Sequence, residues 1–265
     1  MTVLGKHRFD LVEMGTITGF VALVVWVSTQ SILLGPGRTT MIEDNVVEMA
    51  SARFGLQKFS QGPEEWLIRE FFNDRRDGVF VDVGAYDARR FSNTYRIEHD
   101  LGWRGVAIDA IREFAPGYTT YRPNTRFVVA FVADRDEGTA TLHINPKEYA
   151  TSSGDDDFAH VFAKTTVSRE VPRRTLDSIL QDAGVEHFDL LSMDIELGEP
   201  MALSHFTIAR HRPALAVIEA QGQVRQAILD YFARAGYVVV GRYLHADHQN
   251  LYFTPLEGKP VPGQN

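Results

Sequence analysis

Several acidic residues lie at the ends of short apolar runs, and they are the best candidates for chemistry in this chain. Asp82 lies in VFVDVG just before Gly84, Asp109 ends GVAID, Asp194 ends LLSMD and Glu219 ends AVIE. An acid beside a glycine turn can hold a cationic ligand, or it can hydrogen-bond its own backbone. Short apolar runs of this kind are typical of buried strands. Ligands bind beyond the carboxyl ends of parallel strands, so we expect these acids to meet at one edge of a sheet.

The elements that must position these acids are strands that alternate with helices. The sequence predicts strands at Val79–Val83, Val106–Asp109, Phe127–Val132, Thr139–Ile144, Phe188–Met193, Ala214–Glu219, Tyr237–Tyr243 and Asn250–Thr254. It predicts helices near 89–100, 111–121, 175–183, 199–210 and 223–235. This alternation favours a mostly parallel sheet with helices on both faces. The predicted fold class is therefore α/β and Rossmann-like.

The turn after the first strand distinguishes two cofactors that such a fold can bind. The turn GAYDARR lacks the G-x-G-x-x-G pattern of dinucleotide sites, and the bulky Tyr86 would crowd a pyrophosphate. S-adenosylmethionine has no phosphate, and its amino and sulfonium groups are cationic, so a nearby carboxylate attracts it. The turn favours S-adenosylmethionine as the cofactor, with an NAD-dependent oxidoreductase as the alternative.

The remaining acids each have a functional and a plainer interpretation. Asp109 can accept both ribose hydroxyls of a nucleoside, or it can cap the next helix. Asp134 in ADRDEG can reach an adenine amino group, or it can form a turn. Asp194, Glu196 and Glu199 repel one another unless a cation, a proton or a base separates them. Glu199 also suits a helix N-terminus.

Together these segments resemble the FkbM family of S-adenosylmethionine-dependent methyltransferases. The resemblance covers roughly Ser60 to Pro255 and rests on SQGPEE, VFVDVGAYDARRFSNTY, LGWRGVAID, VPRRTLDSIL, FDLLSMDIELGEPMAL, AVIEA and ARAGYVV, in this order. It implies a class I methyltransferase fold, whose seven-stranded sheet ends in an antiparallel strand, and O-methylation of sugar or natural-product hydroxyls. By position it implies cofactor contacts for Asp82, Gly84, Ser92, Asn93, Asp109 and Asp134, and Tyr86 in the turn after the first strand is a further candidate cofactor residue.

The resemblance also covers the acids after the later strands. Asp194, Glu196 and Glu199 match the family signature D-x-E-G-x-E, and Glu219 matches the acid that ends the fifth strand. Two residues depart from the pattern, because Ala88 and Leu197 stand where the family usually has glycine. Leu197 matters more, since a glycine beside the acids permits a tight turn. This departure keeps a third alternative open, a non-catalytic membrane adaptor that retains the fold.

Methyl transfer to a hydroxyl requires an aligned acceptor oxygen and a group that takes its proton. The candidate catalytic residues are Asp194, Glu196 and His245, the last in the segment LHADHQN. Asp194, Glu196 and Glu219 are also the candidate ligands of a divalent cation that lowers the pKa of the acceptor hydroxyl.

Composition narrows the classes of partner. The net charge of −8 disfavours a nucleic acid bound through a broad basic face. The chain has no cysteine, which excludes disulfides, thiolate metal sites and cysteine nucleophiles. The expected partner is a hydroxyl acceptor, either a small molecule or a glycan or lipid.

The N-terminal part differs from the rest. Residues 14–37 carry no formal charge over 24 positions, which is long enough for a transmembrane helix at about 15–34. A buried or interfacial helix and a cleaved signal peptide are the alternatives. We expect three parts: an N-terminal segment at 1–38, helices at 39–75 and a methyltransferase domain at 76–265. The expected location is a membrane, crossed once, with the catalytic domain facing the cytoplasm.

Overall fold

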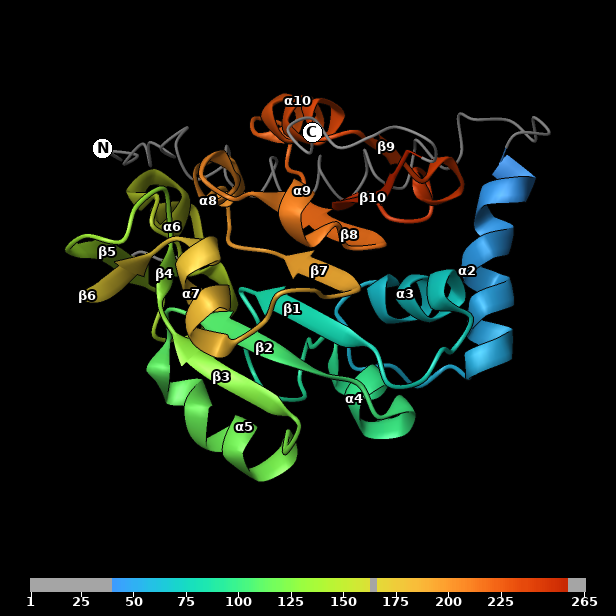
Figure 1. Ribbon diagram of the computed structural model, residues 1–265, viewed down its shortest axis with the longest axis horizontal. Helices are drawn as coiled ribbons and strands as arrows, with labels where there is room; N and C mark the ends of the chain where they lie inside the picture. The colour runs from blue at the N-terminus through green and yellow to red at the C-terminus, as the bar shows by residue number, and fades with distance from the viewer. Residues whose placement is uncertain (1–39, 163–165, 257–265) are drawn as a thin grey trace, which may run out of the picture. The chain divides into compact units, whose positions relative to one another are not determined.

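The computed structural model describes residues 40–162 and 166–256, and its main element is a seven-stranded sheet (Figure 1). The strand order is β3-β2-β1-β7-β8-β10-β9. These strands are β1 Val79–Val83, β2 Arg104–Asp109, β3 Thr125–Val129, β7 Leu190–Met193, β8 Leu215–Glu219, β9 Tyr237–Val239 and β10 Asn250–Pro255. β10 is antiparallel to both β8 and β9, while β3, β2, β1, β7 and β8 are parallel. The predicted α/β class and the antiparallel last strand are confirmed.

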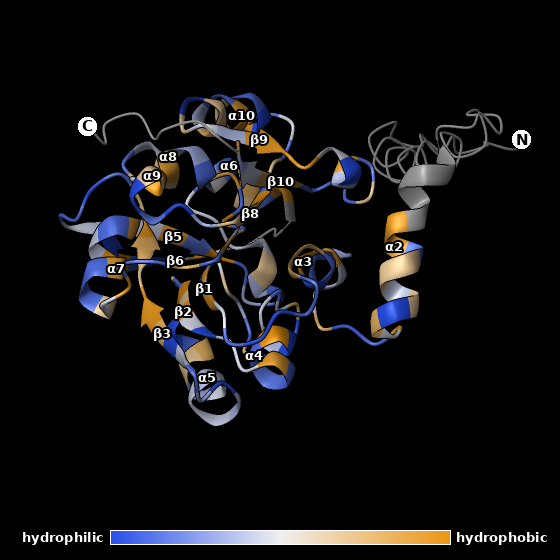
Figure 2. Ribbon diagram, turned by 45° about the vertical axis from the view of Figure 1, so that its right-hand side comes forward, coloured by the Kyte–Doolittle hydropathy of each residue, from blue (hydrophilic) through white to orange (hydrophobic). Residues whose placement is uncertain are grey.

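Helices cover both faces of this sheet because side chains alternate along each strand. Val81 and Val83 of β1 pack in a core with α7 Leu176–Ala183, α8 Glu199–Ser204 and α10 Arg225–Arg234. Phe80 packs on the opposite face with α3 Glu64–Phe72 and α4 Tyr95–Leu101. Figure 2 shows strands such as β3 and β8 as mainly hydrophobic, whereas α7 and α10 also carry hydrophilic residues. The sheet is therefore buried on both sides, as the continuous apolar runs predict.

The described helices are shorter than the predicted ones. The helices not yet named are α2 Thr40–Phe54, α5 Ala115–Tyr121, α6 Asp156–Phe162 and α9 Ile208–His211. Short 3-10 helices lie at Arg112–Phe114, Tyr149–Thr151 and Gly241–Tyr243. The helix predicted near 89–100 begins only at Tyr95, because polar side chains organise the preceding loop. Asp87 accepts hydrogen bonds from two backbone N–H groups of this loop, and Ser92 accepts one from Tyr95. The helix predicted at 199–210 divides into α8 and α9.

A second sheet of three strands, in the order β4-β6-β5, is the largest departure from the prediction. Its strands are β4 Phe131–Val132, β5 Thr139–Ile144 and β6 Val167–Arg174. The predicted strand at 127–132 divides between the two sheets, with β3 in the first and β4 in the second. β6 was not predicted from the sequence, because half of the residues in its segment VSREVPRR are charged.

The predicted transmembrane segment at about 15–34 lies outside the described residues. Among the helices that the structure describes, none is long and apolar enough to cross a membrane. The helices expected within 39–75 are α2 and α3, and the chain from Glu43 onward forms one compact unit.

Candidate active site

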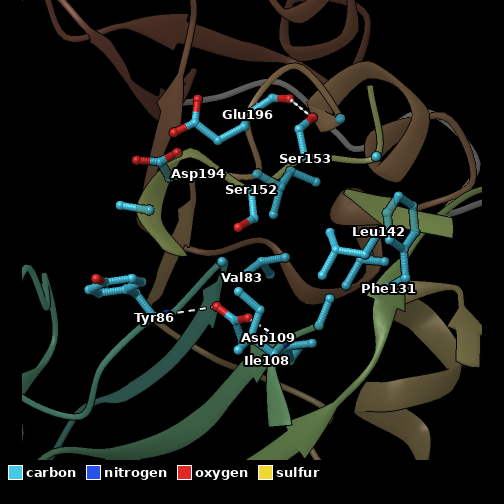
Figure 3. Close-up of a pocket in the computed structure, with 18 of the residues that line it drawn as sticks. Val83, Tyr86, Ile108, Asp109, Phe131, Leu142, Ser152, Ser153, Asp194 and Glu196 are labelled. Carbon is cyan, nitrogen blue, oxygen red and sulfur yellow. Dashed lines mark hydrogen bonds between the residues drawn. The ribbon is translucent and has the colours of Figure 1, made fainter. Parts of the chain in front are cut away.

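A cavity of about 310 Å³ lies at the carboxyl ends of β1, β2 and β7 (Figure 3). Its floor includes Val83 and Asp109, and its far wall comes from β4, β5 and the loop at 149–155. The carboxylates of Asp194 and Glu196 lie at one end of the cavity in Figure 3, and Phe131 lies at the other. This volume is within the range of small-molecule sites, about 300–1,000 Å³. The site is where the topology of the sheet predicts it.

The strand register explains why the acids gather there. Val83 pairs with Ile108 on β2 and with Met193 on β7, and Met193 pairs with Ile218 on β8. The next residue of each strand therefore lies at one level across four neighbouring strands. These residues are Asp109, Gly84, Asp194 and Glu219. The shared level confirms the sequence-based expectation for Asp109, Asp194 and Glu219, whereas Asp82 lies two residues before Gly84 and outside this group.

Gly84 allows the β1 and β7 loops to touch. Its φ is +75°, and a Cβ placed on it would lie 1.6 Å from the backbone carbonyl oxygen of Asp194. Such a contact excludes every side chain, and the positive φ also favours glycine. Gly84 thus allows the backbone of Asp194 to lie against the turn that follows β1.

Asp109 lines the cavity and accepts hydrogen bonds from two backbone N–H groups. Its Oδ2 accepts the backbone N–H of Tyr86 at 2.9 Å, and its Oδ1 accepts that of Ile111 at 2.7 Å. Burial raises its pKa to about 6, against the lowering effect of these hydrogen bonds. Each carboxylate oxygen has a second lone pair, so Asp109 keeps acceptor capacity for ligand hydroxyls.

Among the described residues that line the cavity, Asp82 is not found. It lines a smaller polar recess of about 30 Å³ instead. The two recesses share Gly84 and Asp194. Asp82 faces away from the cavity because side chains alternate along β1, where Val81 and Val83 point to the other face. Its Oδ2 accepts the hydroxyl of Thr94 at 2.7 Å, and burial raises its pKa. Asp82 and Asp109 therefore face neighbouring recesses rather than a single one.

The other predicted cofactor residues fall into two groups. Tyr86 lines the cavity and donates its hydroxyl to Glu148 at 3.1 Å, whereas Asn93 lines the smaller recess and donates to Ser192 at 3.1 Å. Ser92 is buried, and its hydroxyl oxygen accepts N–H groups at the start of α4. It therefore supports the loop beside the recess.

Arg122 is a site-supporting residue that the sequence did not indicate. It is 1% exposed, forms an ion pair with Glu98 and donates to the carbonyl of Ala88 at 3.1 Å. It also donates to Ser92 at 3.2 Å and to Thr94 at 2.9 Å. A single buried guanidinium thus holds the loop between β1 and α4 from behind. In the sequence it stands in YRPNTR and looks like an ordinary surface arginine.

Three carboxylates converge beside the cavity. Asp194, Glu196 and Glu219 each offer an oxygen within 4.8 Å of the others. Burial and the charge of Glu219 raise the pKa of Asp194 well above its ordinary value and that of Glu196 to about 8. Oε2 of Glu219 is buried, and no hydrogen-bond partner for it lies among the described residues. Oxygen ligands of this kind suit a hard divalent cation such as Mg²⁺, so the three acids fit one.

Glu199 serves mainly the backbone turn that precedes α8. Its Oε1 accepts the backbone N–H of Ile195 at 2.8 Å, and burial raises its pKa to about 7. Glu196 and Leu197 in this turn have φ values of 52° and 76°. Leu197 therefore adopts the left-handed conformation that a glycine would adopt without strain. Ala88 is the other departure from the family pattern. It is not one of the described non-glycine residues that have a positive φ, so its position does not require a glycine.

Two predicted site residues, the cofactor candidate Asp134 and the catalytic candidate His245, lie outside the cavity and the smaller recess in the described chain. Asp134 is half-buried with Oδ1 3.4 Å from Nε of Arg135, and His245 is exposed in the loop before β10. The buried acid of that loop is Asp247, which accepts the hydroxyl of Tyr252 at 2.7 Å.

Comparison with known proteins agrees with this geometry. The model of the FkbM methyltransferase domain matches residues 82–239. The chain belongs to the FkbM methyltransferase family. It is an S-adenosylmethionine-dependent methyltransferase. Membership in this family favours the methyl donor over the NAD alternative.

Solved structures resemble the chain only distantly, and no curated protein matches it. A precorrin-6y C5,15-methyltransferase from Geobacter metallireducens has 11% identity and a TM-score of 0.43, covering 74% of this chain and 89% of that one. A TehB-like methyltransferase from Corynebacterium glutamicum has 16% identity and a TM-score of 0.40, covering 81% and 98%. MycE from mycinamycin biosynthesis, in complex with Mg, SAH and mycinamycin VI, has 14% identity and a TM-score of 0.40, covering 97% and 66%. These scores are low, so the family assignment rests on the family model.

Proposed function

We propose that this methyltransferase transfers the methyl group to a hydroxyl of a glycan, a glycolipid or a lipid-linked small molecule. The observation that carries the proposal is the group of three carboxylates at the end of the donor cavity. A hydroxyl is a poor nucleophile until its proton is removed, and a general base works best when its pKa lies near the working pH. Glu196, with its pKa raised to about 8 by burial and by Glu219, fits that requirement.

The cavity offers the donor a suitable set of contacts. When bound, S-adenosylmethionine supplies a methyl group on a cationic sulfur. Asp109 accepts hydrogen bonds from ribose hydroxyls, while Ile108, Ile111 and Phe131 provide apolar walls. The acids around Gly84 favour the positive charge of the donor. A dinucleotide phosphate would meet the same acids and be repelled.

The acceptor is proposed to enter between the acid group and the loop at 149–155. Ser153 of this loop donates its hydroxyl to the backbone carbonyl of Glu196 at 2.8 Å, which fixes the loop against the acids. Asp194 or Glu196 takes the acceptor proton as the new oxygen–carbon bond forms and the carbon–sulfur bond breaks. Met201 adds an apolar residue to the lining of the cavity, which supports an acceptor with an apolar portion.

A divalent cation is the second element of the proposal. Asp194, Glu196 and Glu219 would hold it, and it would lower the pKa of an acceptor hydroxyl bound to it. The raised pKa values of Asp194 and Glu196 mean that protons compete with the cation, so its affinity should rise with pH.

The membrane location is proposed from the sequence. The uncharged stretch at 14–37 supports a single membrane crossing, and a donor drawn from the cytosol supports a catalytic domain on the cytoplasmic side. Protease digestion of sealed inside-out and right-side-out vesicles tests this sidedness. Cleavage of the catalytic domain only in right-side-out vesicles would contradict it.

The decisive assay measures labelled-methyl transfer to membrane glycans and lipids, with and without EDTA. We expect transfer by the wild-type chain, loss of transfer in Glu196→Gln and restoration by Mg²⁺ after EDTA. Donor binding without transfer to any fraction would instead support the non-catalytic adaptor, the interpretation that the strained Leu197 favours.

A further inference from the structure

Gln221 connects two of the three carboxylates, although its position in the sequence did not mark it as functional. It follows the end of β8 by two residues and is half-buried. Its Nε2 lies 3.2 Å from Oε2 of Glu196 and 3.0 Å from Oε1 of Glu219. A primary amide nitrogen carries two N–H groups. Gln221 therefore uses one donor on each acid.

The chemistry of the contact fixes the orientation of this amide. If the amide were turned over, its oxygen would face two carboxylate oxygens at hydrogen-bond distance. Acceptors would then face acceptors, and the contact would be repulsive. The nitrogen must point to the acids whenever they are ionised, which is the state that binds a cation.

The amide leaves the other carboxylate oxygens available. It engages only Oε1 of Glu219, and Oε2 of that residue is buried without a hydrogen-bond partner among the described residues. Glu196 projects from a turn in which its own φ is 52°, and apart from the amide of Gln221 its carboxylate faces other acids. Without Gln221, nothing that the structure describes ties the carboxylates of Glu196 and Glu219 together.

We infer that Gln221 is a positioning residue that clamps Glu196 to Glu219, so that their remaining oxygens face one divalent cation. The inference rests on the proposed cation site. Within the described chain, Gln221 lines neither the cavity nor the smaller recess, so its effect reaches the site through the two acids. Residues that hold a metal ligand by a hydrogen bond typically contribute about 10- to 100-fold to metal affinity.

The test is Mn²⁺ binding to the full chain in the absence of the methyl donor, measured by calorimetry. Gln221→Met keeps the length of the side chain and removes both donors, and we expect it to weaken Mn²⁺ binding about 10- to 100-fold. Gln221→Asn has a shorter side chain that reaches at most one acid, so its Mn²⁺ affinity should lie between that of the wild type and that of Gln221→Met. The matched control is Gln226→Met on α10, where the amide donates to the exposed Asp230 at 2.8 Å. The control should bind Mn²⁺ as the wild type does.

Three results would overturn the inference. The first is wild-type Mn²⁺ affinity in a folded Gln221→Met; if that variant does not fold, wild-type affinity in Gln221→Asn decides in the same way. The second is equal weakening in Gln226→Met. The third is a wild-type chain that binds S-adenosylmethionine but no Mn²⁺, which removes the cation and the clamp yet leaves the methyltransferase assignment intact. Failure of the wild type to bind the donor would instead contradict the proposed function.

Discussion

Leu197 carries backbone strain that can be measured. Its φ of 76° lies in the left-handed region, which costs an L-residue roughly 1–2 kcal/mol relative to the right-handed conformation. Replacing alanine by glycine at this position removes the strain. It also lowers the free energy of unfolding by about 0.4–1 kcal/mol, because glycine gives the unfolded chain more conformational entropy. The comparison of Leu197→Gly with Leu197→Ala isolates the backbone effect, since both variants lose the same leucine contacts. We expect the glycine variant to be more stable by about 1 kcal/mol.

Urea unfolding and thermal unfolding give the measurement. A difference of about 1 kcal/mol corresponds to roughly 2–4 °C in Tm for a domain of this size. The control is the same pair of substitutions at Gln226 within α10. There the alanine variant should be the more stable one, because alanine stabilises a helix by about 1 kcal/mol more than glycine does. Equal stabilities of the two Leu197 variants, or a more stable alanine variant, would refute the assignment of strain to this residue.

Three further predictions concern the groups around the site. Arg122→Met should lower the free energy of unfolding by about 3–5 kcal/mol, because it leaves the buried Glu98 without its ion-pair partner, and adding Glu98→Gln should recover part of this loss in urea titrations. Gly84→Ala should give little folded protein by circular dichroism, since its Cβ would lie 1.6 Å from a carbonyl oxygen; a folded variant with wild-type Tm would contradict the close contact. Burial raises the folded-state pKa of Glu196 to about 8 from an ordinary 4.5, so its contribution to stability is fully present below about pH 4.5 and is lost as the pH rises through 8. Unfolding in EDTA between pH 6 and 9 should show this decline, and Glu196→Gln should flatten it; identical pH profiles would show that Glu196 titrates normally.

The level at which the acids meet could be predicted from the sequence because each acid ends an apolar run. Parallel pairing then aligns those ends, as the register of Val83 with Ile108 and Met193 shows. The direction of Asp82 could not be read from the sequence in the same way, because Val81 and Val83 on one face of β1 and Phe80 on the other are all apolar and buried. Alternation along a strand only places Asp82 on the same face as Phe80.

Other features depend on tertiary contacts that leave no local pattern. β6 carries two adjacent pairs of charged residues and few apolar ones, and Val171 is its buried apolar residue. The run at 127–132 looks continuous, yet the chain changes from one sheet to the other at Ala130. The roles of Arg122 and Gln221 arise from partners far along the chain, so their own neighbours in the sequence could not reveal them.

The most direct test of the central claim is calorimetric binding of S-adenosylmethionine to the wild-type chain and to Asp109→Ala. The account predicts saturable donor binding, no binding of NAD, and an affinity loss of about 10- to 100-fold in the variant, as expected for hydrogen bonds from ligand hydroxyls to a charged group. Undiminished donor affinity in a folded Asp109→Ala, or binding of NAD in place of the donor, would contradict it.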